Sequence, residues 1–290
     1  MNAIIMAAGM SSRFAPLSYE KPKGLLKVKG EILIERQILQ LKEAGITDIT
    51  IVVGYKAEMF SYLVDKFGVS LVFNEDYCRY NNTSSLIRVI DKLENTFICS
   101  SDNYFPQNVF LEKSLTSFYS ALYSEPVTNE YCLTIDSDDN IIDVTIGGED
   151  TWYMVGHVFF NKEFSEEFRK VMIAEYLNES TKLEYWEDVY IRYIDQLPKM
   201  KIRRYHHHEI EEFDSLDELR LFDSEYVNYT GCNIFQSICD SLHCEEADIY
   251  NIVVLKNEVR SFSFVCAKDE RRYICNCSNE GVMVNIHPFV

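Results

Sequence analysis

A regular alternation of short apolar runs and amphipathic stretches over the first 100 residues constrains the fold of this chain more than any other feature. The apolar runs predict buried strands, at residues 2–8, 49–53, 69–73 and 96–99. The amphipathic stretches predict helices, at residues 32–44, 58–67 and 84–93. Strands separated by helices pair in parallel through right-handed crossovers, so the sequence predicts an open, doubly wound, mostly parallel α/β sheet.

The pattern changes after residue 125. Residues 131–135 and 141–145 predict a hairpin, and 153–160 predicts a further strand. Helices are expected at 163–177, 184–196 and 230–244, and short β-like runs at 251–276. Because an acidic region at 206–225 gives way to a different composition, we expect a first domain over 1–228 and a small C-terminal α+β extension over 229–290.

Charge and cysteine content narrow the function. The 290 residues carry a net charge of -18, which disfavours general binding to nucleic acid or anionic membranes. No apolar run has the length of a membrane span, and the beginning of the chain shows no signal-peptide pattern. The nine scattered cysteines are typical of reduced thiols. We therefore expect a cytoplasmic protein that is not inserted in a membrane.

A basic island follows the first predicted strand. Small residues after a strand let backbone N–H groups approach a phosphate, and Arg13 and Lys23 add positive charge. The loop is neither a Walker A motif nor a Gly-x-Gly-x-x-Gly fingerprint, and an ordinary turn with solvated lysines is the alternative. The candidate phosphate loop consists of Ala7, Ala8, Gly9, Met10, Ser11, Ser12 and Arg13.

Two aspartates are candidates for a metal site. Asp102 ends the strand predicted at 96–99, where ligands of open α/β sheets bind. Asp214 is the second candidate, although Ser215 and Glu218 form a capping box that could place it merely at a helix entrance. Mg²⁺ that bridges phosphates needs one or two carboxylates, so this pair would suffice.

The loop with Lys21-Pro22-Lys23 after it resembles the nucleotidyltransferase signature, although Ser11 stands where members often have glycine. Further segments resemble bacterial CTP:phosphocholine cytidylyltransferases over about residues 1–225, a family with a Rossmann-like sheet. They are Asn74-Glu75-Asp76-Tyr77, Tyr80-Asn81-Asn82, Ser84-Ser85-Leu86, Ser101-Asp102-Asn103-Tyr104, Thr128-Asn129-Glu130-Tyr131, Tyr185-Trp186-Glu187-Asp188 and Glu212-Phe213-Asp214-Ser215.

The resemblance implies roles for these residues. Asp102 and Asp214 would bind Mg²⁺, and Arg13, Lys23 and Asp102 would be catalytic. The phosphate loop, Lys23, Asn81, Asn82 and Ser85 would bind the nucleotide, CTP. The reaction would be CTP + phosphocholine → CDP-choline + pyrophosphate, with in-line attack on the α-phosphorus.

A cationic acceptor is also favoured by the residue types, because aromatic faces backed by carboxylates bind quaternary ammonium groups. Packing in the core is the alternative for each aromatic side chain. The candidate acceptor residues are Glu130, Tyr131, Trp152, Tyr185, Trp186, Glu187 and Asp188, with Tyr153 next to Trp152. Phosphoethanolamine, aminoethylphosphonate or a sugar 1-phosphate are alternative acceptors. A catalytically silent nucleotide-binding regulatory protein is an alternative of a different class.

The remaining motifs predict little chemistry. His206-His207-His208 would alternate in direction on a strand, so we expect a solvated strand end and no metal site. Cys275 and Cys277 lack a second pair of ligands at zinc spacing. Residues 248–274 faintly resemble the opening strands of choline-kinase-like lobes, but no catalytic loop follows. Packing or homodimerisation is left as the role of the extension.

Overall fold

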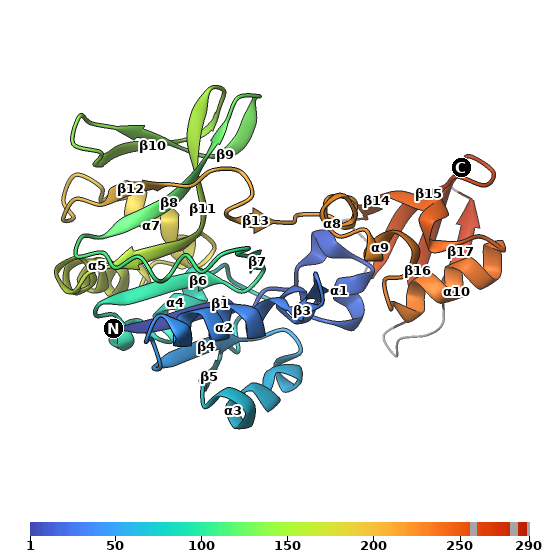
Figure 1. The fold of residues 1–290 in the computed structure, drawn as a ribbon, viewed down its shortest axis with the longest axis horizontal. Coiled ribbons are helices and arrows are strands. Elements are labelled where there is room, and N and C mark those ends of the chain that lie inside the picture. The colour runs from blue at the N-terminus through green and yellow to red at the C-terminus, as the bar shows by residue number, and fades with distance from the viewer. Residues whose placement is uncertain (256–259, 279–283, 289–290) are drawn as a thin grey trace. The chain divides into compact units, whose positions relative to one another are not determined.

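The computed structural model describes residues 1–255, 260–278 and 284–288, and it divides into two compact units (Figure 1). The large unit consists of Met1–Gly9 and Ile32–Glu212. The small unit consists of Met10–Glu31 and Phe213–Val290. The small unit thus combines the segment after the first strand with the end of the chain, while the division into functional domains at residue 228 stays a prediction.

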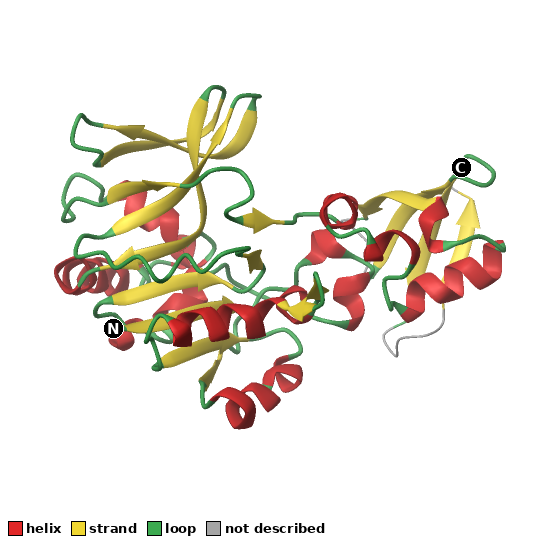
Figure 2. Ribbon diagram, viewed as in Figure 1, coloured by secondary structure: helices red, strands yellow, loops and turns green. Residues whose placement is uncertain are grey.

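The large unit is built on a mixed sheet of nine strands, visible as the stack of arrows in Figure 2. Its parallel part has the order β6-β1-β4-β5. The bounds are β1 Asn2–Ala7, β4 Ile49–Val53, β5 Ser70–Phe73 and β6 Thr96–Ser100. These are the four strands expected from the apolar runs, and the α/β prediction is confirmed.

The other half of the sheet is mainly antiparallel. Strand β11 pairs antiparallel with β6, β8 and β9, while β10 continues the sheet beyond β9 and β12 runs parallel to β8. The bounds are β8 Phe118–Ser124, β9 Thr128–Ile135, β10 Ile141–Gly148, β11 Thr151–Phe160 and β12 Lys201–Arg204. The short pair β7 (Asn103–Tyr104) and β13 (Glu211–Glu212) lies outside this sheet.

Helices cover the large sheet. Apolar residues of α4, α5 and α7 share one core cluster with β1, β6, β8, β9 and β11. The helical segments of this unit are α2 Leu33–Glu43, η3 Ala57–Phe60, α3 Tyr62–Phe67, α4 Thr83–Ile87, η4 Ile90–Lys92, α5 Lys162–Glu175, α6 Glu179–Lys182 and α7 Trp186–Arg192. The helices expected at 58–67 and 84–93 are each split into a 3₁₀ turn and a short α-helix, and that at 184–196 is shorter.

The small unit joins two distant parts of the sequence through hydrogen bonds. Asp223 Oδ2 accepts the Lys29 N–H at 2.6 Å, and the Tyr226 hydroxyl donates to the Lys27 carbonyl at 3.1 Å. The first part holds η1 Ser12–Phe14, α1 Leu17–Glu20, η2 Lys23–Leu25 and β2 Lys27–Val28, and β3 (Glu31–Ile32) follows at the junction. The second holds α8 Leu216–Phe222, α9 Glu225–Asn228, α10 Asn233–Leu242 and η5 Glu246–Asp248.

An antiparallel sheet completes the small unit, in the order β14-β15-β16-β17. Its strands are β14 Ile249–Val254, β15 Ser261–Cys266, β16 Arg271–Cys277 and β17 Val284–Pro288. The expected helix and β-like runs of the extension are therefore present, and the resemblance to a kinase lobe stays a prediction. None of the described helices combines the length and hydropathy needed to cross a membrane.

A buried histidine lies in the core of the large unit. His157 of β11 is 1% exposed, and the Ser120 hydroxyl of β8 lies 2.9 Å from its Nδ1. Burial, reinforced by the positive charge of Arg203, lowers the pKa of His157 to about 3. The rings around it belong to Phe97, Phe105, Phe110, Phe118 and Tyr205.

This histidine should make stability depend on pH. Because the folded-state pKa is depressed, His157 stays neutral in the fold and protonates in the unfolded chain below about pH 6.5. Its stabilising effect is present above pH 6.5 and is lost toward pH 3, by about 1.4 kcal/mol per pH unit. Urea unfolding at pH 7.5 and 5.0 should show a smaller pH effect in His157→Gln than in wild type. The exposed control His206→Gln should show the wild-type change in unfolding free energy between the two pH values. An equal change in all three proteins would contradict the assignment.

Candidate active site

The phosphate loop is divided between the two units. Ala7, Ala8 and Gly9 follow β1 in the large unit, where the Tyr55 N–H donates to the Ala8 carbonyl at 3.0 Å. Met10 to Arg13 belong to the small unit. Ser11 has φ 48° and ψ 45°, the left-handed conformation. A glycine would adopt this conformation without steric cost, so Ser11 is the more strained choice at this position.

The basic residues of the loop have defined neighbours within the small unit. Arg13 Nη1 lies 2.7 Å from Asp214 Oδ2, with side chains 75% and 37% exposed. Such an exposed ion pair adds little stability, so its partners can exchange it for other ligands at low cost. Lys23 is buried in η2, with its Nζ 5.3 Å from the centre of the Phe14 ring.

Asp214 stands directly before a capped helix. The Ser215 hydroxyl accepts the Glu218 N–H at 3.2 Å at the start of α8, and the Glu218 carboxylate accepts the Asp214 N–H at 2.8 Å. The Ser215 cap expected from the sequence is therefore present, but Glu218 reaches back to the Asp214 N–H and not to that of Ser215, so the capping box itself is incomplete. The cap fixes the backbone of Asp214, and its carboxylate contacts Arg13 instead of taking part in the cap.

Asp102 follows β6 at the carboxyl ends of the parallel strands. The Ser100 hydroxyl donates to its Oδ1 at 2.5 Å, and the Ser101 N–H donates to the Met6 carbonyl of β1 at 3.1 Å. Because β6 and β1 are paired in register, the carboxylate is held at the edge of the sheet where β1 ends. Asp102 and Asp214 belong to different units.

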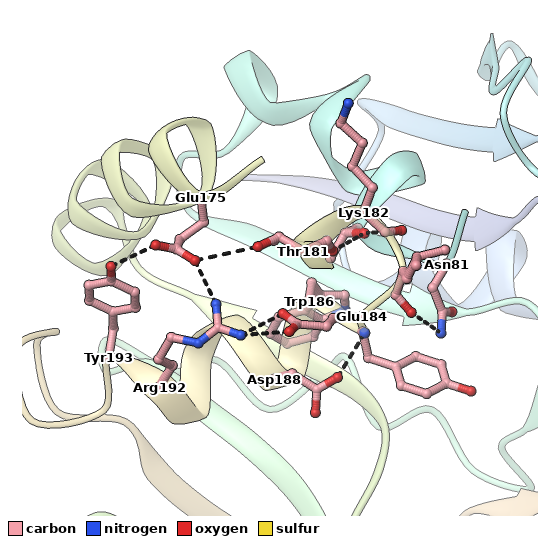
Figure 3. A network of polar contacts seen from close by, with 12 residues as sticks. Asn81, Glu175, Thr181, Lys182, Glu184, Trp186, Asp188, Arg192 and Tyr193 are labelled. Carbon is pink, nitrogen blue, oxygen red and sulfur yellow. Dashed lines mark hydrogen bonds and ion pairs between the residues drawn. The ribbon is translucent and has the colours of Figure 1, made fainter. Parts of the chain in front are cut away.

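The residues predicted to bind the nucleotide lie at and just before the start of α4, and hydrogen bonds join them to the segment around α6 and α7 (Figure 3). Asn81 Nδ2 donates to the Leu183 carbonyl at 3.4 Å. The Asn82 side chain accepts the Trp186 N–H at 2.7 Å and donates to Glu187 at 3.2 Å. Ser85 is buried, and its hydroxyl accepts from Asn74 at 3.0 Å. Asn82 thus stabilises the start of α7, and Asn81 holds the segment before it.

The acidic residues of α7 are hydrogen-bonded to tyrosines of the sheet. The Tyr131 hydroxyl donates to Asp188 at 2.8 Å, and the Tyr119 hydroxyl donates to Glu187 at 3.1 Å. Burial raises the pKa of Glu187 to about 7. Tyr185 is exposed, and its ring centre lies 6.5 Å from that of Tyr131. The structure therefore brings together four side chains of the predicted acceptor set, those of Tyr131, Tyr185, Glu187 and Asp188.

The tryptophans have mainly packing contacts. Trp186 is buried and stacks on Tyr119 with ring centres 5.9 Å apart. Trp152 lies 5.2 Å from the Tyr123 ring, and the Arg204 guanidinium lies 5.5 Å from its ring centre. One cation therefore already occupies a position over Trp152.

A cavity of about 160 Å³ lies on the other face of β11. Tyr153 pairs with Leu122 and Cys132 across the sheet, so its side chain points away from that of Trp152. The lining residues are Leu122, Tyr153, Val155, His207, His208, Ile210, Glu211 and Glu212. Burial, followed by the negative charges of Glu130, Glu212 and Glu211, raises the pKa of Tyr153. The cavity thus combines an aromatic ring with a concentrated negative charge.

The cavity is connected to Asp102 by strand pairing. Glu212 of β13 is the register partner of Asn103 of β7, whose Nδ2 donates to Glu212 at 3.4 Å. Asn103 directly follows Asp102. A Cβ on Gly156 would lie 2.1 Å from Asn103 Oδ1, so only glycine allows this close approach. A ligand held in the cavity is therefore close to the end of β6.

Comparisons with known proteins identify the family. Residues 3–130 match the MobA-like NTP transferase domain. The chain is 35% identical to choline-phosphate cytidylyltransferase from Streptococcus pneumoniae over 79% of this chain and 99% of that protein. It is also 35% identical to 2-aminoethylphosphonate cytidylyltransferase from Lancefieldella rimae, over 78% of this chain and 93% of that protein. The solved CTP:phosphocholine cytidylyltransferase from Streptococcus pneumoniae matches with a TM-score of 0.74, 34% identity, and coverage of 77% and 98%.

The chain belongs to the bacterial choline-phosphate cytidylyltransferase family. It is a nucleotidyltransferase, and its relatives imply CTP and a phosphorylated substrate. Nucleotidyltransferases of this kind generally use a divalent metal ion.

The residues of this cytidylyltransferase fit such an ion only with help from the nucleotide. Among the described residues there is no group of three or more His, Cys, Asp or Glu side chains that could hold a metal. A Mg²⁺ that binds phosphates retains waters and takes one or two carboxylates. The hard oxygen donors of Asp102 and Asp214 suit that mode.

Two glutamates and a histidine turn escaped the sequence prediction. Glu211 and Glu212 line the cavity, whereas the sequence placed Glu211 only in an acidic region and Glu212 in a family-like segment without a role of its own. Strand β13 consists of these two residues alone, so no periodic pattern in the sequence separates them from the other acidic residues nearby. His207 and His208 lie in a turn after β12, where His208 has φ 72°, and not on a strand end. The expectation of alternating directions was therefore wrong, although they are exposed to solvent as expected.

Proposed function

We propose that this enzyme transfers CMP from CTP to phosphocholine with Mg²⁺, giving CDP-choline and pyrophosphate. The observation that carries the proposal is the cavity beside Asn103, where Tyr153 meets Glu211 and Glu212. An ammonium group is attracted to an aromatic face and to carboxylates, and each desolvated cation–π contact contributes up to about 2 kcal/mol. The identity to choline-phosphate cytidylyltransferases supports the same acceptor.

The acceptor residues divide into two groups under this proposal. Tyr153, Glu212 and Glu130 would attract the trimethylammonium group. Tyr131, Tyr185 and Asp188 would form a second candidate wall, beside α7 on the face of the sheet opposite the cavity. Glu187 and Trp186 would hold that wall in place, because Glu187 is bonded to Tyr119 and Asn82 and Trp186 is buried. Trp152 would contribute through packing against Tyr123.

The nucleotide would bind through the loop after β1. Backbone N–H groups of residues 8–12 would approach the triphosphate, and Arg13 and Lys23 would neutralise its charge. Asn81, Asn82 and Ser85, at and just before α4, would border the nucleotide, and their side chains are held in place by hydrogen bonds.

Asp102 and Asp214 would hold Mg²⁺ together with phosphate oxygens. The bound ion supplies positive charge where the triphosphate gains negative charge during transfer. Arg13 would leave Asp214 to contact phosphate, which the exposed ion pair permits at low cost. The acceptor phosphate attacks the α-phosphorus in line and pyrophosphate leaves, so positioning and charge neutralisation are the main requirements.

Location and assembly are part of the proposal. All nine cysteines are free thiols, which supports a reducing compartment such as the cytoplasm. Homodimerisation through residues 229–290 stays a prediction, as does the absence of nucleic acid among the partners.

A 2-aminoethylphosphonate acceptor is the second candidate. The relative from Lancefieldella rimae carries that name at the same 35% identity. Its primary ammonium would donate hydrogen bonds to Glu211 and Glu212, whereas a trimethylammonium would not.

Pyrophosphate release tests the function. Purified protein with Mg²⁺ and CTP should release pyrophosphate with phosphocholine, because the cavity suits a bulky apolar cation. Phosphoethanolamine, 2-aminoethylphosphonate and glucose 1-phosphate should be poorer acceptors, and ATP, GTP and UTP should be poorer donors. Faster release with 2-aminoethylphosphonate would replace the acceptor, and CTP binding without any release would favour a regulatory protein.

Removal of either metal carboxylate should abolish turnover. Asp102→Ala and Asp214→Ala should each lower kcat at least 100-fold. Each variant lacks a ligand of the Mg²⁺ that would neutralise the phosphate charge. Circular dichroism should show that both variants remain folded. The exposed Asp91→Ala is the control for loss of one negative charge and should keep wild-type kcat. Wild-type turnover in either site variant would contradict the metal assignment.

The cavity glutamate should determine acceptor affinity. Glu212→Gln should raise the KM for phosphocholine at least tenfold and leave the KM for CTP within twofold, because only the acceptor carries the cation. The neighbouring exposed Glu209→Gln, which does not line the cavity, serves as the matched control. An equal rise of both KM values would show that Glu212 acts elsewhere.

A further inference from the structure

Six of the nine cysteines belong to the small unit. Cys275 and Cys277 lie two residues apart on β16, so both side chains point to the same face of the strand. Their sulfur atoms are 3.8 Å apart. Cys275 is buried, whereas Cys277 is partly exposed. One thiol of this pair is therefore accessible to a reagent, and the other lies directly behind it.

Charged neighbours distinguish the two thiols. The hydrogen bond from Cys275, together with the positive charge of Arg260, lowers the pKa of Cys277. The same hydrogen bond and burial raise the pKa of Cys275. Arg260 is held beside the strand, because its backbone carbonyl accepts the Cys277 N–H at 3.1 Å. A partly exposed thiol with a lowered pKa, 3.8 Å from a buried thiol with a raised pKa, is the arrangement of a reactive and a resolving cysteine.

We infer that Cys277 is a site of thiol–disulfide exchange with a low-molecular-weight disulfide, and that Cys275 resolves it into a Cys275–Cys277 disulfide. The small disulfide is the oxidant, and the two protein thiols are oxidised. Neither cysteine belongs to the machinery proposed for CMP transfer.

The two steps balance as follows. The Cys277 thiolate attacks one sulfur of the small disulfide, the S–S bond breaks, and one small thiolate leaves. Cys275 then loses its proton, attacks the Cys277 sulfur and releases the second small thiolate. The products are one protein disulfide and two small thiols, and two electrons have passed from the protein to the reagent.

Strand geometry makes this disulfide easy to reduce again. Residues two apart on a strand have Cα atoms about 6.6 Å apart, at a rise of about 3.3 Å per residue. This distance is at the upper end of the range for disulfides, and strained disulfides have oxidising potentials. The bond is therefore suited to a reversible modification and not to permanent stabilisation.

The pair is connected to the segment that carries Arg13 and Lys23. Arg260 donates to the Tyr19 carbonyl at 3.4 Å, and its guanidinium lies 5.1 Å from the centre of the Tyr19 ring. The next residue, Glu20, accepts the N–H groups of Asn233 and Ile234 at the start of α10. A Cys275–Cys277 disulfide pulls the Cys277 sulfur into a new bond beside Arg260, which a serine at 277 does not, so oxidation should disturb the end of α1.

Titration with oxidised glutathione tests the site. The reduced full-length protein is incubated in mixtures of oxidised and reduced glutathione, its remaining thiols are alkylated, and tryptic peptides are identified by mass spectrometry. Cys275 and Cys277 share the peptide 273–290, which contains no other cysteine. This peptide should lose two hydrogen atoms at a lower proportion of oxidised glutathione than is needed to modify any other cysteine. Cys275→Ser should instead retain glutathione on Cys277.

An activity measurement tests the connection to α1, and this arm alone rests on the proposed function. Oxidation should raise the KM for CTP at least threefold, and dithiothreitol should reverse the change. Cys277→Ser should have wild-type activity when reduced and no response to oxidation, whereas exposed Cys78→Ser should respond like wild type. Earlier modification of another cysteine, or an unmodified Cys277 in Cys275→Ser, would overturn the site. A disulfide without a change in KM would overturn its connection to α1.

Discussion

The parallel pairing of β1 with β4 on one side and β6 on the other is the constraint on which the large unit depends. The register places the ends of β1 and β6 next to each other, so the phosphate loop and Asp102 begin at the same edge of the sheet. Since β1 and β4 are almost completely buried, this register is fixed by burial on both faces. The functional loops can therefore vary while their starting points remain fixed.

The antiparallel half of the sheet gives the site its acidic and aromatic character. β11 places Trp152 and Tyr153 on opposite faces, and the two rings consequently meet different surroundings. One face is closed by α7, where Asp188 and Glu187 bind tyrosine hydroxyl groups. The other face remains hollow and collects the carboxylates of Glu211 and Glu212. Two of the chain's carboxylates thus lie where a cationic substrate would bind, while basic residues follow β1.

The small unit shows how a C-terminal extension can act on an N-terminal loop. Its two parts are more than 180 residues apart in sequence, yet Glu20 caps the start of α10 and Asp223 binds the backbone of Lys29. Residues 10–31 carry most of the charged groups of the signature, and they fold with the end of the chain. The segment that would contact the triphosphate is therefore stabilised by residues from the other end of the chain.

The sequence determined those features that depend on local patterns. The four parallel strands follow from buried apolar runs, the start of α8 from the Ser215 and Glu218 side chains, and the family from short motifs in a fixed order. Only the tertiary structure decided which side chains face a common space. Local patterns did not predict the 3₁₀ turns at 57–60 and 90–92 or the packing of Trp186. They also did not predict that Glu212 lines the cavity or that residues 10–31 fold with the extension. The physical reason is that these features depend on contacts between distant residues, whereas periodicity reports only the immediate surroundings of a residue along the chain.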